Sequence, residues 1–389
     1  MFKTMQKNSD LKRVLIITRN LPPLIGGMER LNWHMADELS KYYCVKVIAP
    51  TGSANLKPKH LDMIEVPLVP LWLFLILSLW EAIKITLQWK PDIILAGSGL
   101  TALAAKLSSI FYTKSKSVAY LHGLDITADH RLYRLIWLPI LRQLDHVITN
   151  SSPTSQLVSN LGIPDTRVSI IFPGVNLPRT IQTQAQIEQF LHKYQLQNKH
   201  ILLSVGRLTT RKGIHEFIQY ALPDIVKAMP NIVLVIIGES PKNALLAETQ
   251  SKESIEATVS QLGLQEHVKF LGKIDDQSLS YAYESSHVHV FPVRHIPNDP
   301  EGFGMVAIEA AAHGLPTVAF ATGGVVDAIS DGKSGYLVRS EDYLLLTQAV
   351  IKALALNNFW KKSCQTFAKN FTWENFGNDI KTKLNNILN

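Results

Sequence analysis

The chain has 389 residues, of which 46% are apolar and 18% are charged. That length can bury the hydrophobic cores of two domains, and the composition is that of a folded protein, so disordered chains and small disulfide scaffolds are excluded. The two cysteines, Cys44 and Cys364, lie far apart and lack metal-ligand spacing. They favour a reducing compartment and no thiolate zinc site.

Positive charge is concentrated in the first part of the chain. Residues 1–180 hold 20 Lys/Arg and 12 Asp/Glu, a balance of +8, whereas the remainder has a balance of −1. This asymmetry indicates an anionic surface or substrate for the first part. Residues 1–10 are polar and no apolar stretch follows them, so the sequence shows no signal peptide.

Short apolar runs alternate with helical stretches through the first half. A glycine- and proline-containing loop follows the first run, and a helix is predicted from about Glu29 to Ser40. Buried strands separated by helices are typical of a parallel sheet with helices on both faces. The predicted strands are Arg13–Thr18, Val45–Ala49, Asp92–Ala96, Ser117–Leu121, His146–Thr149 and Ser169–Phe172.

Two apolar or amphipathic stretches interrupt this pattern. Val66–Trp80 is a 15-residue apolar run with two prolines, shorter than the roughly 20 residues that a spanning helix needs. His130–Arg142 interleaves basic residues with Tyr133, Trp137 and leucines. We expect both to be helices packed within a domain; contact with an anionic membrane is the alternative that the charge excess keeps open.

The alternation restarts after the polar stretch at residues 180–200. The strands predicted there are Ile201–Val205, Ile232–Ile237, Val268–Leu271, Val288–Phe291 and Thr317–Phe320. The sequence therefore predicts an α/β protein of two doubly wound, Rossmann-like domains that face each other across a cleft. Ligands of such sheets bind beyond the carboxyl ends of the strands, so the loops that follow the strands are the candidate sites.

Two glycine-rich loops follow strands of the first half. Gly26 and Gly27 precede a helix and can let backbone N–H groups approach a phosphate, although a plain tight turn explains the pair equally well. Gly97-Ser98-Gly99 with Ala102 matches G-x-G-x-x-A. No acidic residue ends a following strand about 20 residues later, so we interpret this motif as helix packing.

Charged residues occupy two strand-end loops of the second half. Arg207 follows the strand at 201–205, and Lys212 lies just before the next helix, so the two cations can form a diphosphate site or a solvated charge cluster. Glu301 lies in the turn Pro300-Glu301-Gly302-Phe303-Gly304, and Glu309 lies about one turn into an Ala-rich helix predicted from Met305 to His313. Both carboxylates can address one ligand at that helix N-terminus.

His122, before Gly123, ends a strand of the first half, where a ligand contact and a structural role are equally plausible. The chain has no D-x-D sequence, which speaks against a metal–diphosphate mode built on paired aspartates. It also lacks the G-x-S-x-G, H-E-x-x-H and Walker motifs.

The ordered set of motifs resembles the GT4 family of retaining glycosyltransferases with the GT-B fold, over nearly the whole chain. The motifs are GGMER, HG at 122–123, GRL and RKG at 206–213, EGFG-x4-E at 301–309, HGLPTVAFATGG, DGKSGYLV and the closing FTWE. The resemblance implies an N-terminal acceptor-binding domain, 1–180, to which a last helix at about 370–389 returns. It also implies a C-terminal nucleotide-sugar-binding domain, 181–369.

In such a family, Arg207 and Lys212 would neutralise the diphosphate of a nucleotide-sugar donor. Glu309 would bind the ribose hydroxyls, and Glu301 would bind hydroxyls of the donor sugar. Gly302, Phe303 and Gly304 would present backbone N–H groups to donor oxygens.

On the side of the first domain, the resemblance places His122 near the anomeric carbon and the Gly26–Gly27 loop near the diphosphate or acceptor. Two positions depart from the family pattern: the sequence reads PGVN at 173–176 where N-G-V-D is common, and Asp327 follows the T-G-G turn where Glu is common. These two departures concern the part of the site that would bind the acceptor.

The resemblance implies a retaining, metal-independent hexosyltransferase without cofactor, with a nucleotide sugar and a glycan or lipid-linked acceptor as substrates. Cell-surface polysaccharide, lipopolysaccharide or glycolipid synthesis would be its setting. The expected location is the cytoplasm, with peripheral contact to the inner membrane face, and no nucleic acid is expected. The alternatives are a GT-B sugar phosphorylase or epimerase, and a non-catalytic nucleotide-sugar-binding module. A donor-hydrolysis assay with several nucleotide sugars separates all three.

Overall fold

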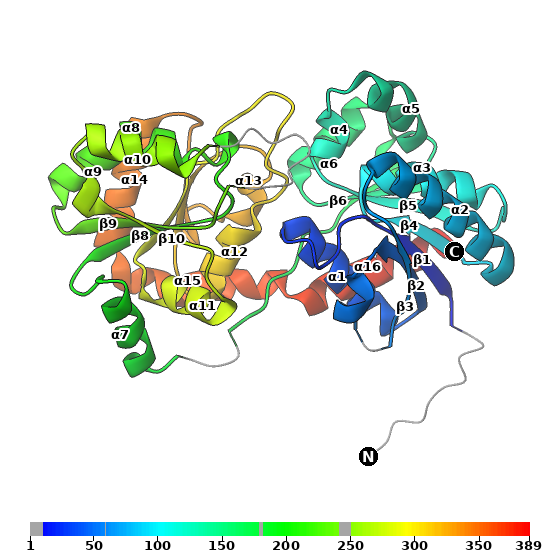
Figure 1. Cartoon of the computed structure of the whole chain (residues 1–389), viewed down its shortest axis with the longest axis horizontal. Coiled ribbons are helices and arrows are strands. Elements are labelled where there is room, and N and C mark those ends of the chain that lie inside the picture. The colour runs from blue at the N-terminus through cyan, green and yellow to red at the C-terminus, as the bar shows by residue number, and fades with distance from the viewer. Residues whose placement is uncertain (1–10, 59, 179–181, 241–249) are drawn as a thin grey trace, which may run out of the picture. The chain divides into compact units, whose positions relative to one another are not determined.

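The computed structural model describes residues 11–58, 60–178, 182–240 and 250–389. The polar segment 1–10 and the predicted domain boundary at 180/181 lie outside these residues. The chain forms two compact units, one made of Met1–Gly174 with Trp373–Asn389 and the other of Val175–Thr372 (Figure 1).

Unit 1 contains a seven-stranded sheet in the order β3-β2-β1-β4-β5-β6-β7, and every strand pair is parallel. Its central strands are buried on both faces, which explains their continuous apolar sequences. The strands are β1 Arg13–Ile17, β2 Cys44–Pro50, β3 Asp62–Val66, β4 Ile93–Ala96, β5 Lys116–Leu121, β6 His146–Thr149 and β7 Val168–Ile170.

Helices cover both faces of this sheet. Helices α2 and α5 both pack on α3, whereas α1 packs on α16, the last helix of the chain (Figure 1). The helices are α1 Gly27–Ser40, α2 Leu71–Trp89, α3 Gly99–Ser109, α4 Leu124–Thr127, α5 Arg131–Leu141, α6 Ser152–Asn160 and α16 Trp373–Leu388.

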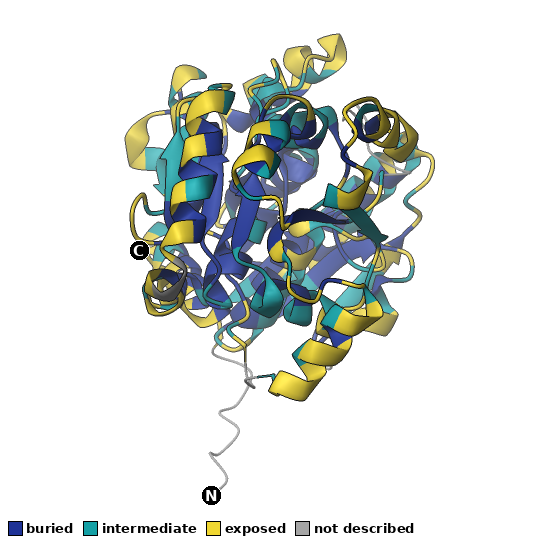
Figure 2. Cartoon of the chain, turned by 90° about the vertical axis from the view of Figure 1, so that its left-hand side faces the viewer, coloured by how far each residue is buried: buried dark blue, intermediate teal, exposed yellow. Residues whose placement is uncertain are grey.

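Unit 2 contains a six-stranded parallel sheet in the order β10-β9-β8-β11-β12-β13. Its strands are β8 His200–Val205, β9 Ile232–Ile237, β10 Val268–Gly272, β11 Val288–Phe291, β12 Thr317–Phe320 and β13 Gly335–Val338. Its helices are α7 Gln184–Lys193, α8 Ile214–Tyr220, α9 Leu222–Ala228, α10 Lys252–Gln261, α11 Asp276–Ser285, α12 Met305–Ala312, α13 Val325–Ala328, α14 Tyr343–Ala355 and α15 Asn357–Ala368. In Figure 2 the central strands are buried, the edge strands are partly buried, and the outer faces of the helices are exposed.

The predicted α/β class with two Rossmann-like sheets is confirmed, and most predicted strands agree with the observed ones to within one or two residues. Two strands escaped prediction, β3 and β13. β3 (DMIEV) carries two acidic residues that interrupt its apolar run, and β13 (GYLV) has an apolar run of only three residues. The apolar run Val66–Trp80 joins the end of β3 to the start of α2, which continues to Trp89.

The Gly97–Gly99 motif serves helix packing, as the sequence analysis interpreted it. A Cβ atom on Gly97 would lie 2.0 Å from the Asn32 Oδ1 atom, and one on Gly99 would lie 2.6 Å from the Tyr133 hydroxyl. Only glycine fits between the strand end and these side chains, so the motif brings α1 and α5 close to β4.

Trp373 ties α16 to the rest of unit 1. Its buried indole stacks on the His34 ring of α1, with centroids 3.9 Å apart, and it packs so close to Gly174 that a Cβ there would lie 2.6 Å from it. Residues from the two ends of the chain thus share one core.

We predict that Trp373→Ala destabilises unit 1 by about 3 to 5 kcal/mol, because it removes a large buried ring and leaves a cavity. Hydrogen exchange of the α1 amides should accelerate accordingly, since α1 packs on α16. Trp72→Ala is the matched control, because that indole is exposed on α2 and its loss should change stability by less than about 0.5 kcal/mol. Equal effects of the two substitutions would contradict the assigned packing.

Candidate functional site

A cluster of cations surrounds one carboxylate at the carboxyl edge of the unit 2 sheet. Lys212 Nζ lies 2.7 Å from Glu301 Oε2, and Arg211 Nε lies 3.3 Å from the same oxygen. Arg211 Nη1 also pairs with Asp299 Oδ1 at 2.6 Å and donates to the Pro300 carbonyl at 3.0 Å. The loop after β8 is therefore joined to the loop before α12 by three ionic contacts.

These side chains are largely withdrawn from water. Between 11% and 14% of the Arg211, Lys212 and Glu301 side chains remains accessible. Burial opposes ionisation of Glu301, but the charges of Lys212 and Arg211 outweigh it and lower the pKa of the carboxyl to about 2. Burial lowers the pKa of Lys212, and Glu301 opposes that shift. Glu301 is consequently an anion at every physiological pH.

Backbone packing fixes the loop that carries Glu301. The amide of Gly324, in the T-G-G turn, donates to the Glu301 carbonyl at 2.8 Å. A Cβ on Gly324 would lie 2.0 Å from the Gly302 carbonyl oxygen, so the two loops can approach this closely only because residue 324 is glycine. The T-G-G turn, which the sequence analysis treated only as part of a resemblance, thus supports the Glu301 loop.

Arg207 lies on the same strand-end loop but is exposed. Its charge acts on both Lys212 and Glu301, which places it near the cluster. The structure therefore brings Arg207, Lys212 and Glu301 into one electrostatic site, with Lys212 bound to the carboxylate and Arg207 facing solvent.

Glu309 lies on α12 and is buried. The Tyr283 hydroxyl of α11 donates to Glu309 Oε2 at 3.2 Å, and the Tyr283 ring stacks on the His313 imidazole at 5.0 Å. His313 Nδ1 lies 2.9 Å from the Glu309 carbonyl oxygen. This network holds one carboxylate oxygen of Glu309 in a defined orientation.

The residues between the two glutamates contribute backbone rather than side chains. The Phe303 ring is buried against Phe371, with centroids 5.9 Å apart, so it is part of the core. Gly304 adopts a left-handed conformation, with φ of 96°, at the residue before α12. Gly302 packs against the T-G-G turn, as described above.

His122 is buried at the end of β5 in unit 1. Its Nδ1 atom lies 3.3 Å from the Asn150 amide nitrogen, which donates the hydrogen bond and leaves the proton of the neutral imidazole on Nε2. Burial lowers the pKa of His122, although Asp125, the Gly97 carbonyl and Glu29 oppose the shift. His122 is therefore neutral at physiological pH.

Glu29 connects His122 to the glycine loop. It accepts a hydrogen bond from the Asn20 amide at 2.8 Å, and a Cβ on Gly26 would lie 2.3 Å from its Oε2 atom. Gly26 begins α1 as its N-cap, and Gly27, its first residue, is exposed. The Gly26–Gly27 loop and His122, the two candidate site features predicted in unit 1, thus lie at one edge of its sheet, where β1 and β5 end.

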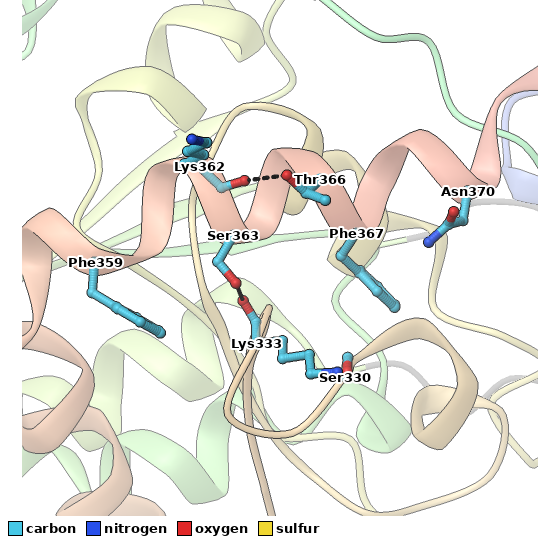
Figure 3. A pocket seen from close by; sticks show the side chains of 8 residues that line it. All are labelled: Ser330, Lys333, Phe359, Lys362, Ser363, Thr366, Phe367 and Asn370. Atoms are coloured by element: carbon cyan, nitrogen blue, oxygen red, sulfur yellow. Dashed lines mark hydrogen bonds between the residues drawn. The ribbon is translucent and has the colours of Figure 1, made fainter.

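A separate cavity of about 630 Å³ lies in unit 2 between α15 and the turn before β13 (Figure 3). The Ser363 hydroxyl donates to the Lys333 carbonyl at its wall, at 2.6 Å. Its lining contains none of the predicted site residues; it consists of Ser330, Lys333, Phe359, Lys362, Ser363, Thr366, Phe367 and Asn370.

Two known protein families match the sequence of this chain, one in each unit. Residues 25–179 match the family described as Glycosyltransferase Family 4, and residues 186–372 match Glycosyl transferases group 1. Each unit is thus similar to a glycosyltransferase family over most of its length. Together the two matches cover most of the chain and both predicted site regions.

Curated relatives carry related names. A GDP-mannose-dependent α-(1-6)-phosphatidylinositol monomannoside mannosyltransferase of Mycolicibacterium smegmatis is 30% identical over 203 residues, which are 52% of this chain and 50% of that protein. A D-inositol 3-phosphate glycosyltransferase of Geodermatophilus obscurus is 28% identical over 240 residues, which are 60% of this chain and 51% of that protein. The chain thus spans about half the length of the curated relatives that it matches.

Solved structures show that the fold is that of GT-B glycosyltransferases. Anabaena HepE in complex with UDP superposes with a TM-score of 0.80 at 18% identity, over 96% of this chain and all of that one. WaaG, a glycosyltransferase of lipopolysaccharide biosynthesis, superposes with a TM-score of 0.66 over 95% of this chain and 98% of that one, at 18% identity.

Several residues of the site lay beyond the sequence analysis. Arg211 adjoins Lys212 and appeared in the sequence analysis only within the RKG motif, although its side chain contacts Glu301, Asp299 and the Pro300 carbonyl. Asp299, two residues before Glu301, was an available signal. No sequence pattern indicated Tyr283 or Asn150, because each lies far in sequence from the residue that it contacts, Glu309 and His122 respectively.

We predict that Glu301→Gln lowers the free energy of unfolding of unit 2 by on the order of 3 kcal/mol at pH 7, because it leaves the largely buried Lys212 without its anion and removes one of the two carboxylates that Arg211 contacts. The pKa of Glu301 is about 2 in the folded chain and 4.5 ordinarily, so its stabilisation is complete above about pH 4.5 and is lost as the pH falls toward 2. Urea unfolding between pH 3 and 7 measures this.

The matched control is Glu256→Gln, which breaks the exposed Lys252–Glu256 pair and should change stability by less than about 1 kcal/mol. A difference between wild type and Glu301→Gln that stays constant down to pH 3 would contradict the electrostatic origin.

Proposed function

We propose that the protein is a retaining, metal-independent glycosyltransferase that moves a sugar from a nucleotide-diphosphate-sugar to a glycan or lipid-linked acceptor. The observation that carries the proposal is the cluster of Lys212, Arg211 and Glu301 at the carboxyl edge of a parallel sheet, together with the oriented carboxylate of Glu309 on the helix that follows the Glu301 loop. Cations next to carboxylates suit a ligand that presents both phosphates and hydroxyls.

The names of related proteins support a nucleotide-sugar donor. HepE has been solved with UDP and with UDP-glucose, and the mycobacterial relative is named as GDP-mannose-dependent. For this chain we propose a nucleotide diphosphate sugar bound by unit 2, with Arg207 and Lys212 on the diphosphate. Glu309 accepts hydrogen bonds from the ribose and Glu301 from the sugar, while the backbone of 302–304 donates to donor oxygens.

The low pKa of Glu301 suits the role of hydroxyl acceptor. An ionised carboxylate accepts hydrogen bonds from sugar hydroxyls without donating in return. Lys212 can turn to a phosphate while Arg211 remains to hold Glu301 in place, since Arg211 reaches the same oxygen independently. In this arrangement Lys212 binds the ligand and Arg211 holds the Glu301 loop.

In the reaction that we propose, the bond from the anomeric carbon to the phosphate oxygen breaks and the leaving diphosphate gains negative charge. Fixed cations stabilise that charge in place of a metal ion. The acceptor hydroxyl attacks from the face that the phosphate leaves, and its proton passes to a phosphate oxygen. From unit 1 we assign His122 and the Gly26–Gly27 loop to this reaction, with cell-surface polysaccharide or glycolipid synthesis in the cytoplasm as the setting.

The test is release of nucleoside diphosphate from a panel that begins with UDP-glucose and GDP-mannose, with and without acceptor. Slow hydrolysis without acceptor supports a transferase. Release of sugar 1-phosphate with inorganic phosphate would show a phosphorylase, and epimerised sugar would show an epimerase. Donor binding without turnover would show a binding module.

We predict that Arg207→Ala and Lys212→Ala each lower turnover at least a hundredfold, because each removes one fixed charge, worth about 3 kcal/mol, from the developing anion. Arg339→Ala is the control, since that exposed arginine pairs with Asp342 and lies on none of the proposed site loops. Near-normal turnover of either site variant, with an unchanged circular dichroism spectrum, would remove the diphosphate assignment.

A further prediction concerns metal ions. Activity should survive excess EDTA with at most a small change, because Arg207 and Lys212 supply the positive charge that a metal would otherwise bring to the diphosphate. Loss of activity that Mg²⁺ or Mn²⁺ restores would refute this arrangement.

A further inference from the structure

The outer surface of α2 carries large apolar side chains that none of the described residues of unit 1 covers. Val69, Trp72, Ile76 and Trp80 are exposed to 79%, 62%, 57% and 65%. The three helical positions are spaced four residues apart and therefore form one stripe along the helix. A surface helix of a globular domain normally presents polar residues there, so this stripe requires a partner.

The inner face of α2 accounts for only part of its apolar composition. Phe74, Ser78, Ala82 and Ile85 are buried, and they hold the helix against the sheet and α3. The most apolar 18-residue window of α2 has a mean hydropathy of 1.5 but is only 28% buried. By length and composition α2 could cross a bilayer, yet its inner stripe packs it into the fold. The outer stripe of Trp72, Ile76 and Trp80 is therefore available to contact a surface outside unit 1.

Helix α5 presents a second apolar stripe on the same side of the sheet. Leu132 and Leu135 are exposed to 52% and 75%, and Ile136 is exposed as well. Both α2 and α5 pack on α3, so they flank the same helix (Figure 1). We call the exposed surfaces of α2 and α5, with the loop residue Val69, the α2–α5 face.

Basic residues accompany these stripes. Residues 67–142, which contain α2, α3 and α5, include eight Lys/Arg and four Asp/Glu. Arg131 and Arg134 alternate with the exposed leucines of α5, and Lys84 continues the α2 stripe one turn beyond Trp80. Asp129 pairs with Arg134 and Glu81 with Lys84, whereas Arg131 of α5 has no ion pair with any described residue.

We propose that the α2–α5 face docks on an anionic lipid bilayer and holds unit 1 at its interface. Tryptophan side chains favour the boundary between headgroups and acyl chains, and neighbouring arginines and lysines can pair with lipid phosphates. A second copy of the chain offers the same net positive charge on this face, so charge complementarity favours lipid over self-association.

The placement of the stripes has a consequence for the acceptor, and this consequence rests on the proposed function. Helices α2 and α5 both follow strands of the sheet; Trp72 and Leu132 lie in their first turns, and Val69 lies in the loop before α2. The α2–α5 face therefore reaches the carboxyl edge that holds His122. A lipid-linked acceptor would reach that edge without leaving the bilayer.

Flotation of the full chain with vesicles tests the docking and does not depend on transfer activity. The wild type should float with vesicles of phosphatidylcholine and phosphatidylglycerol at low salt. It should float at least about tenfold less with phosphatidylcholine alone or in 0.5 M NaCl, because exposed charges are screened. Equal binding to neutral and anionic vesicles, or binding to neither, would overturn the proposal.

The double variant Trp72→Ser/Trp80→Ser should lose flotation at least about tenfold. Arg131→Gln should weaken flotation and make the remaining flotation less sensitive to salt, because one screened charge contact is gone. The matched control is Leu344→Ser/Tyr220→Ser, which removes two exposed apolar side chains from unit 2 and should float like the wild type. Donor hydrolysis by the tryptophan variant should equal that of the wild type, which shows that unit 1 is folded and separates this test from that of the reaction.

Two further measurements identify what covers the face. Brominated lipids should quench the fluorescence of the wild type more than that of Trp72→Phe/Trp80→Phe, because phenylalanine keeps the stripe apolar and removes the reporting indoles. A lipid-free dimer that the double serine variant turns into a monomer, without flotation of the wild type, would assign the face to a second copy and refute the membrane proposal.

Discussion

Parallel pairing of every strand is the constraint on which the rest of the molecule depends. When all strands of a sheet run in one direction, every loop that follows a strand lies at a single edge, however far apart the loops are in sequence. In unit 2 this edge collects the segments around residues 206–213 and 299–304. The same rule in unit 1 brings the glycine loop after β1 beside the histidine after β5.

At that edge of unit 2, ion pairs between the two loops hold charged side chains together in a largely buried cluster. Glu301 is largely buried, which by itself would favour its neutral form, yet two cations keep it charged. Those cations are in turn kept from repelling each other by the carboxylates of Glu301 and Asp299. Each loop therefore depends on the other for its conformation. A ligand that binds Lys212 must compete with Glu301, which makes the site selective for strongly anionic groups.

Much of this fold could be predicted from sequence because buried parallel strands are short, apolar and separated by helices. The prediction failed at β3, whose two acidic residues interrupt the apolar run, and at β13, whose apolar run is only three residues long. For the site, the loops that carry Arg207, Lys212 and Glu301 were predictable from their place after strands. The clamp by Arg211, the orientation of Glu309 by Tyr283 and the hydrogen bond from Asn150 to His122 were not, since each is a contact between distant segments that only packing determines.

The return of α16 to unit 1 has a consequence for how the chain folds during synthesis. The ribosome releases the strands of unit 1 first, then the whole of unit 2, and only then the helix that packs on α1. Until α16 emerges, His34 of α1 lacks the indole that stacks on its imidazole, and Tyr43, between α1 and β2, lacks the side chain that accepts its hydrogen bond. The nascent chain therefore carries an incomplete first domain while about two hundred residues of unit 2 are added.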